Sequence, residues 1–198
     1  MVSATWAGEA RRLTTGGEVL EWSAMPEFPA PDPVRPMLRH LAATLAYRAA
    51  KALRDAPPGF ATYSIGQGRR TPVGIVAHLA DLMTWALHMA NGEYRWAAEG
   101  GEDWDTEVRR FLDGLSRLDQ RLADSRPLGY PAEMLIQGPL ADGLTHVGQL
   151  TMLRGAAGFP VRPESYARAE ILAGRVGLEQ AAPGKEFDGD ASRPREER

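Results

Sequence analysis

The sequence contains no cysteine in 198 residues. This absence excludes disulfide bonds, thiolate metal ligands and a cysteine nucleophile. Any thiol chemistry therefore needs a thiol that a ligand brings. Histidine is also scarce, with four copies in the chain.

The chain also lacks an excess of one charge and a long apolar run. Its 23 basic and 26 acidic residues give a formal net charge of −3, without the basic surface of a nucleic-acid or membrane-surface binder. No apolar stretch approaches the roughly 20 residues that cross a bilayer, and the N-terminus does not resemble a signal peptide. We therefore expect a cytoplasmic protein of one domain with neither nucleic-acid nor membrane partners.

Apolar residues recur at helical spacing in four segments, each bounded by helix start and stop signals. The four predicted helices run from Asp32-Pro33 to Pro57, from Thr71-Pro72 to Asn91-Gly92, from Asp105-Thr106 to Pro127, and from Gly138-Pro139 to Gly158. No segment has the alternating pattern of paired strands. The sequence thus predicts an all-α four-helix bundle.

The remaining segments are predicted to be accessory to this bundle. Residues 1–31 are expected to form an irregular N-terminal arm, 32–180 the bundle domain, and 181–198 a disordered charged tail. A short extra C-terminal helix is predicted from Pro163 to Leu172. The loop Gly66–Arg70 matches no phosphate-binding fingerprint, so we expect only a flexible connection there.

Asp142 and His146 lie four residues apart in the last predicted helix. This spacing places both on one face, which Leu150 and Leu153 continue, so the pair points toward a core. In bundles, metal sites are built from inward-facing side chains of neighbouring helices, and His78 of the second helix can complete the set. Two imidazoles and a carboxylate suit Zn²⁺ with an open fourth position, and also Fe²⁺ or Ni²⁺. The alternative is that Asp142 is favoured only by the helix dipole and His146 is a half-buried, hydrogen-bonded histidine.

Two segments resemble a known family. Thr71–Leu82 (TPVGIVAHLADL) and Gly138–Arg154 (GPLADGLTHVGQLTMLR) are similar to the second and fourth helices of the DinB family, the DinB/YfiT-like metalloenzymes. The resemblance covers roughly residues 33–160. It implies a four-helix bundle, commonly a homodimer, that binds a divalent metal through one histidine of the second helix and a histidine pair spaced by four on a later helix.

The chain departs from this pattern at one ligand, because Asp142 stands where the commonest pattern has histidine. A carboxylate there is similar to the mycothiol-dependent maleylpyruvate isomerases of the same superfamily, which carry glutamate. Aspartate is one methylene shorter, so the metal is expected to lie closer to the helix or to bind more weakly. The resemblance implies metal binding by His78, Asp142 and His146.

Four further residues are candidates for supporting roles, each with a plainer alternative. Gln149 can orient a ligand histidine or simply pack. Trp85 can wall a pocket, although packing is the commoner role of such a residue. Asp81 can hydrogen-bond an imidazole or be solvated. Arg154 can bind the carboxylate of a thiol cofactor or acidic substrate, or be a helix C-terminal cation.

The leading functional hypothesis is a metal-dependent enzyme acting on a small-molecule substrate. The expected metal is Zn²⁺, with Ni²⁺, Fe²⁺ or Mn²⁺ as alternatives. The resemblance favours a thiol S-transferase or thiol-dependent isomerase that uses a low-molecular-weight thiol, with metal-dependent hydrolysis as the alternative. The further alternative is a non-catalytic metal-binding or structural helical-bundle dimer. No residue can be assigned as the catalytic acid or base.

Overall fold

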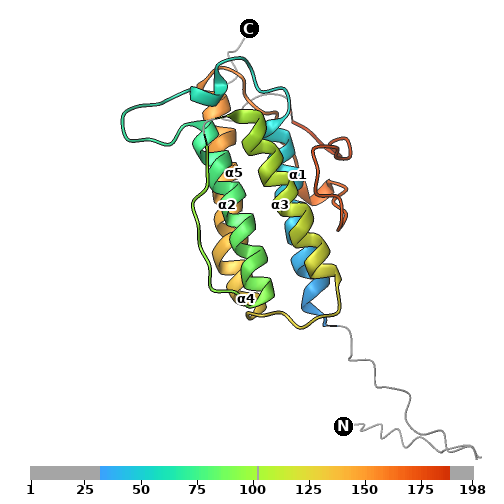
Figure 1. The fold of residues 1–198 in the computed structure, drawn as a ribbon. Coiled ribbons are helices and arrows are strands. Elements are labelled where there is room, and N and C mark those ends of the chain that lie inside the picture. Colours follow the sequence, from blue (N-terminus) through green and yellow to red (C-terminus); the bar gives the residue numbers. More distant parts are fainter. Residues whose placement is uncertain (1–31, 102, 188–198) are drawn as a thin grey trace, which may run out of the picture. The chain divides into compact units, whose positions relative to one another are not determined.

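The computed structural model describes residues 32–101 and 103–187. The predicted N-terminal arm lies outside this range, as does the tail from residue 188. The described chain forms four long helical segments, which confirms the predicted all-α four-helix bundle (Figure 1). They are α1 (Val34–Leu53), α2 (Pro72–Asn91), α3 (Trp104–Ala123), and a composite helix of α4 (Ala132–Leu135), a π-helical turn (Ile136–Leu140) and α5 (Ala141–Ala156).

The helices do not simply alternate in direction along the chain. In Figure 1, α1 and α5 rise from the lower end of the bundle while α2 and α3 both descend. The connection from α2 to α3 therefore runs the length of the bundle, alongside α2. Around the bundle, α2 packs against α3 and α5, and α1 packs against the same two helices. This arrangement brings the middle of α2 next to the first half of α5.

The caps explain where α2 and α3 begin. The Thr71 hydroxyl accepts a hydrogen bond from the Gly74 backbone N–H (3.3 Å), and Pro72 occupies the first turn, as the sequence predicts. The Asp103 carboxylate accepts from the Thr106 N–H (2.8 Å). The third helix therefore starts at Trp104, one residue before the predicted Asp105-Thr106, because Asp103 is the cap.

The fourth helix differs more from the prediction. Helical structure begins at Ala132, before the predicted start at Gly138-Pro139, and a kink at Gly138 separates this first part from α5. Gly138 adopts non-helical angles (φ −87°, ψ −107°), and the wider π-helical turn accommodates the proline, which has no N–H to donate. Asp142 therefore lies in the first turn of α5, directly after this kink, where a helix dipole favours an acidic residue, as one of the two sequence interpretations expects.

The core lies between the four helices, and α2 is its most buried member. Leu79, Leu82 and Met83 of α2 are almost fully inaccessible, as are Phe111 and Leu115 of α3. Contrary to the sequence prediction, α2 is long and apolar enough to cross a membrane. However, 72% of its most apolar window is buried inside the bundle, as expected for a helix that forms the core of a fold.

The C-terminal segment packs against α1. The predicted helix from Pro163 to Leu172 reduces to the short 3-10 turn η3 (Tyr166–Arg168), because ion pairs to α1 hold this segment in an irregular path. The Lys51 ammonium lies 2.7 Å from a carboxylate oxygen of Glu164 and 2.7 Å from one of Glu186. Glu186 belongs to the segment predicted as a charged tail, and its side chain contacts α1 through this ion pair.

Candidate metal centre

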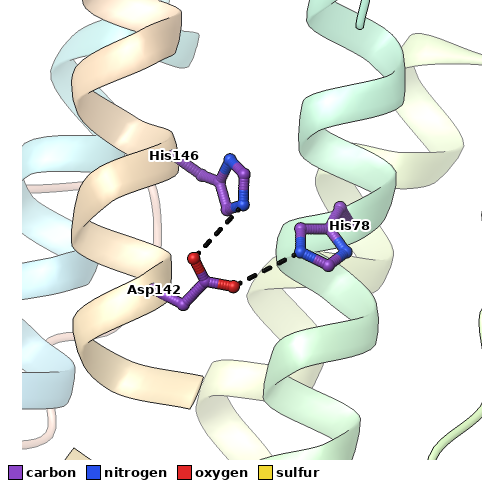
Figure 2. A group of neighbouring side chains, drawn as sticks. All are labelled: His78, Asp142 and His146. Atoms are coloured by element: carbon purple, nitrogen blue, oxygen red, sulfur yellow. Dashed lines mark ion pairs between the residues drawn. The ribbon is translucent and has the colours of Figure 1, made fainter. Parts of the chain in front are cut away.

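Three side chains from two helices converge at one point of the bundle (Figure 2). His78 projects from α2, while Asp142 and His146 project from α5 one turn apart. The Nε2 atom of His78 lies 3.5 Å from Asp142 Oδ2, and Nε2 of His146 lies 3.4 Å from Asp142 Oδ1. Possible ligand atoms of all three lie within 4.8 Å of one another. The structure thus brings together the three residues that the sequence selects as metal ligands.

The spacing of these donors fits a small divalent ion. Donors about 2.1 Å from a tetrahedral ion stand roughly 3.4 Å apart. Each imidazole lies near this distance from one Asp142 oxygen, His78 from Oδ2 and His146 from Oδ1. The two imidazole side chains are mostly buried, with 18% and 11% of their surface exposed, whereas Asp142 is 45% exposed. Protein therefore surrounds the nitrogen donors, and the carboxylate side faces a cavity. This is the form of a site that leaves one position open for a ligand.

Gln149 supports His146 from behind. Its Oε1 atom lies 2.7 Å from His146 Nδ1 and accepts a hydrogen bond from that nitrogen. The proton is then on Nδ1, so the lone pair of Nε2 faces His78 and Asp142. Such a partner fixes both the tautomer and the ring orientation of a ligating histidine. Gln149 lies one turn beyond His146 on α5. The helical period of the sequence is therefore sufficient to predict that these two side chains are neighbours.

The surroundings of His78 keep its imidazole neutral. Burial is the largest effect and lowers the pKa of His78 below its usual value of 6.5, and the positive charge of Arg70 lowers it further. The Asp142 carboxylate acts in the opposite direction but does not reverse the shift. A neutral imidazole has a free lone pair, so His78 is in the form that a metal ligand requires.

A cavity of about 800 Å³ opens in front of the three donors. Gln149 also lines it, and the rest of its wall combines apolar and cationic side chains: Ile65, Ile75, Met152, Leu153, Arg69 and Arg70. The loop that carries Arg69 and Arg70 forms part of this wall, so the prediction of a mere connection misses its role. A loop has no periodic pattern comparable to that of a helix. The position of this loop in the cavity wall therefore could not be predicted from the sequence.

A second cavity, of about 340 Å³, lies on another side of the centre and is mainly aromatic. Trp85 and Trp96 pack edge to face with ring centroids 5.7 Å apart, and Trp96 packs similarly against His78 at 5.8 Å. Trp85 therefore walls a pocket, one of the two roles that the sequence leaves open. His78 and Asp142 line this cavity as well as the larger one. The candidate centre thus lies where these two cavities meet, and Asp142 and Trp85 also line a third cavity of about 420 Å³.

Trp96 is held in place by a buried ionic cluster. Asp81 is 4% exposed, and its Oδ1 lies 2.6 Å from Arg110, which also pairs with Glu107 at 2.7 Å. The two carboxylates accept backbone N–H groups of the connection that carries Trp96, from Glu99 (3.2 Å) and Gly101 (2.7 Å). Asp81 is therefore neither an imidazole partner nor a solvated residue, and both sequence expectations for it are wrong. Its partner Arg110 lies 29 residues away and could not be inferred locally.

Arg154 does not contact either cavity. It is 9% exposed, and its guanidinium donates to backbone oxygens at the end of α1, including those of Ala52 (3.1 Å) and Arg54 (2.6 Å). It also donates to the Phe159 carbonyl (3.2 Å). These contacts connect the ends of α1 and α5. They give Arg154 a structural role in place of the cofactor-binding role suggested by the sequence.

The other two histidines lie apart from the donors. His40 is exposed on α1, and the His88 ring contacts the Arg95 carbonyl (3.2 Å) near the opposite end of α2. Within the described residues, His78, Asp142 and His146 are the group with the composition and spacing of a metal site. Comparison of the chain with protein-family models, with curated proteins and with solved structures finds no match.

Proposed function

We propose that this protein is a divalent-metal enzyme that activates a low-molecular-weight thiol and joins it to a second small molecule. The observation that carries the proposal is the convergence of His78, Asp142 and His146 at the junction of two cavities. The resemblance of the helices bearing these residues to those of the DinB family agrees with it. Zn²⁺ is the expected ion, since two imidazoles and one carboxylate are a common donor set for it.

The chemistry follows from the donors and the space around them. A divalent ion bound here supplies positive charge that lowers the pKa of a thiol or a water molecule at its open position. His78 and His146 bind through neutral nitrogens, and Asp142 adds one negative charge, so a bound divalent ion would keep a net positive charge. Gln149 keeps the proton of His146 away from the donor atom.

Two cavities favour thiol transfer over hydrolysis. A transfer or thiol-dependent isomerisation needs room for a thiol and for an organic electrophile, whereas hydrolysis needs one organic substrate and water. In transfer, the thiol loses its proton, its sulfur bonds to an electrophilic carbon, and a leaving group departs with the bonding electrons. In isomerisation, sulfur adds to a conjugated double bond and is expelled after rotation. No described residue is assigned as the proton acceptor.

Hydrolysis is the second candidate, and the exposure of Asp142 favours it. Because 45% of that side chain is accessible, water can reach the open side of the centre. Both reactions need the same ion, so metal binding tests the shared part of the proposal.

The first experiment is elemental analysis of the protein purified without a chelator or a histidine tag. We expect about one divalent ion per chain, lost in His78→Ala and in Asp142→Ala but kept in His88→Ala, which is the matched control. No ion in the parent protein, even after reconstitution, would overturn the proposal.

A second experiment separates the two reactions. In protein loaded with Co²⁺, a thiolate that binds the ion adds a charge-transfer absorption band, and we expect small thiols to produce it. A loaded protein that gives no such band but cleaves activated esters would favour hydrolysis.

A further inference from the structure

The larger cavity carries positive charge on part of its wall. Arg69 and Arg70 both line it, and both are exposed. They belong to the loop before α2, so they share a cavity with the metal donors although they lie outside the donor set. Any molecule that reaches the centre through this cavity meets these two guanidinium groups.

Neither arginine is neutralised within the described part of the chain. No described residue forms a hydrogen bond or ion pair with Arg69 or Arg70, whereas Arg110, Arg121 and Arg154 are all bonded to protein oxygens. Asp142 is the one carboxylate among the residues lining the cavity, and it belongs to the proposed metal centre. Two positive charges thus line a ligand-sized space in which Asp142 is the one negative charge.

Apolar side chains make up much of the remaining cavity wall. Ile65, Ile75, Met152 and Leu153 line the same cavity as the donors and the arginines. A complementary ligand would therefore have one end that binds a metal, an apolar body, and an anionic end. Guanidinium groups bind carboxylates with two parallel hydrogen bonds, so a carboxylate is the anion that suits them well.

On the basis of the function proposed above, we infer that Arg69 and Arg70 form a carboxylate-binding subsite, and that the preferred thiol of this centre carries a carboxylate at the end remote from sulfur. The subsite selects the ligand and does not take part in bond formation. Because both guanidinium groups are exposed, each contributes modestly to affinity, on the order of three- to fivefold.

The test compares two thiols of equal chain length, 6-mercaptohexanoate and 6-mercaptohexanol, on Co²⁺-loaded protein. Their affinities are read from the thiolate-to-cobalt absorption band. In the parent protein we expect the acid to bind about tenfold more tightly than the alcohol, and the preference to decrease as salt is added. The six-carbon chain is too long to favour chelation of the ion by sulfur and carboxylate together.

Variants assign this preference to the two arginines. In Arg69→Ala and in Arg70→Ala the preference should fall to about threefold, and the double variant should bind both thiols equally well. Arg117→Ala is the matched control, because Arg117 is an exposed arginine that lines a different cavity on α3. It changes the net charge equally and should leave the preference near tenfold.

The possible failures are distinguishable. Absence of bound Co²⁺ would refute the proposed metal function itself. Bound Co²⁺ with no thiolate band from either compound would refute the proposed thiol chemistry, and with it the subsite inference. Equal affinity for the two thiols in the parent protein, or a preference that survives in the double variant, would overturn the subsite inference alone.

Discussion

Removing the Gln149 side chain should weaken metal binding far more than it weakens the fold. Gln149 accepts a hydrogen bond from His146 Nδ1 at 2.7 Å. In Gln149→Ala the ring loses this partner, so the proton can move to the donor nitrogen and the ring can rotate. Loss of such a partner typically reduces metal affinity about 10- to 100-fold, or about 1.4–2.7 kcal/mol.

The effect on folding without metal should be smaller. One neutral hydrogen bond contributes about 1 kcal/mol to the free energy of unfolding, and Gln149 is only partly buried. Gln149→Glu is the matched variant, because it keeps the acceptor and its negative charge makes the imidazole more basic. We expect it to bind the ion at least as tightly as the parent.

Competition with a coloured chelator measures these affinities, and thermal unfolding in the presence of EDTA measures stability. We expect the metal affinity to be highest in Gln149→Glu, intermediate in the parent and lowest in Gln149→Ala, with a much smaller spread in melting temperature. Equal metal affinity in Gln149→Ala and the parent would show that this hydrogen bond does not orient the ligand.

Three further predictions concern the donors and the frame that holds them. Added Zn²⁺ should raise the melting temperature of the parent and of His88→Ala but not of His146→Ala, since binding to the folded state alone stabilises it; an equal response from both variants would refute the ligand assignment. In the metal-free protein, the lowered pKa of His78 means that the unfolded chain binds a proton at higher pH than the folded chain does. This part of the stability is present above pH 6.5 and decreases as pH falls below it, so the free energy of unfolding measured by urea titration should fall less steeply there in His78→Ala. Arg154→Met should lower the free energy of unfolding by about 3 kcal/mol, because the buried Ala52 carbonyl and the partly buried carbonyls of Arg54 and Asp55 lose their donor; a loss below about 1 kcal/mol would contradict this role.

Local signals in the sequence were sufficient for the existence of the four main helices and for the pairing of Asp142 with His146 on one helix face. Caps such as Thr71-Pro72 act over a few residues, and a 3.6-residue apolar period defines which face turns inward. The same reasoning places His146 one turn from Asp142, and Gln149 close to both. It also identifies His78 as an inward-facing histidine of a neighbouring helix. The choice of His78 also rests on the expected packing of a four-helix bundle and on the family resemblance.

Tertiary structure decided everything that depends on residues far apart in the chain. The direction of α2 and α3, and hence the long connection between them, places Trp96 against His78. Packing also buries Asp81 against Arg110 and brings the loop with Arg70 to the cavity wall. Such contacts carry no periodic signal, because a loop has no repeating face and a charged residue shows its partner only after the chain has folded. The sequence alone thus identified the four main helices and the three candidate donors, whereas the fold determined the cavities beside them and the charges that line these cavities.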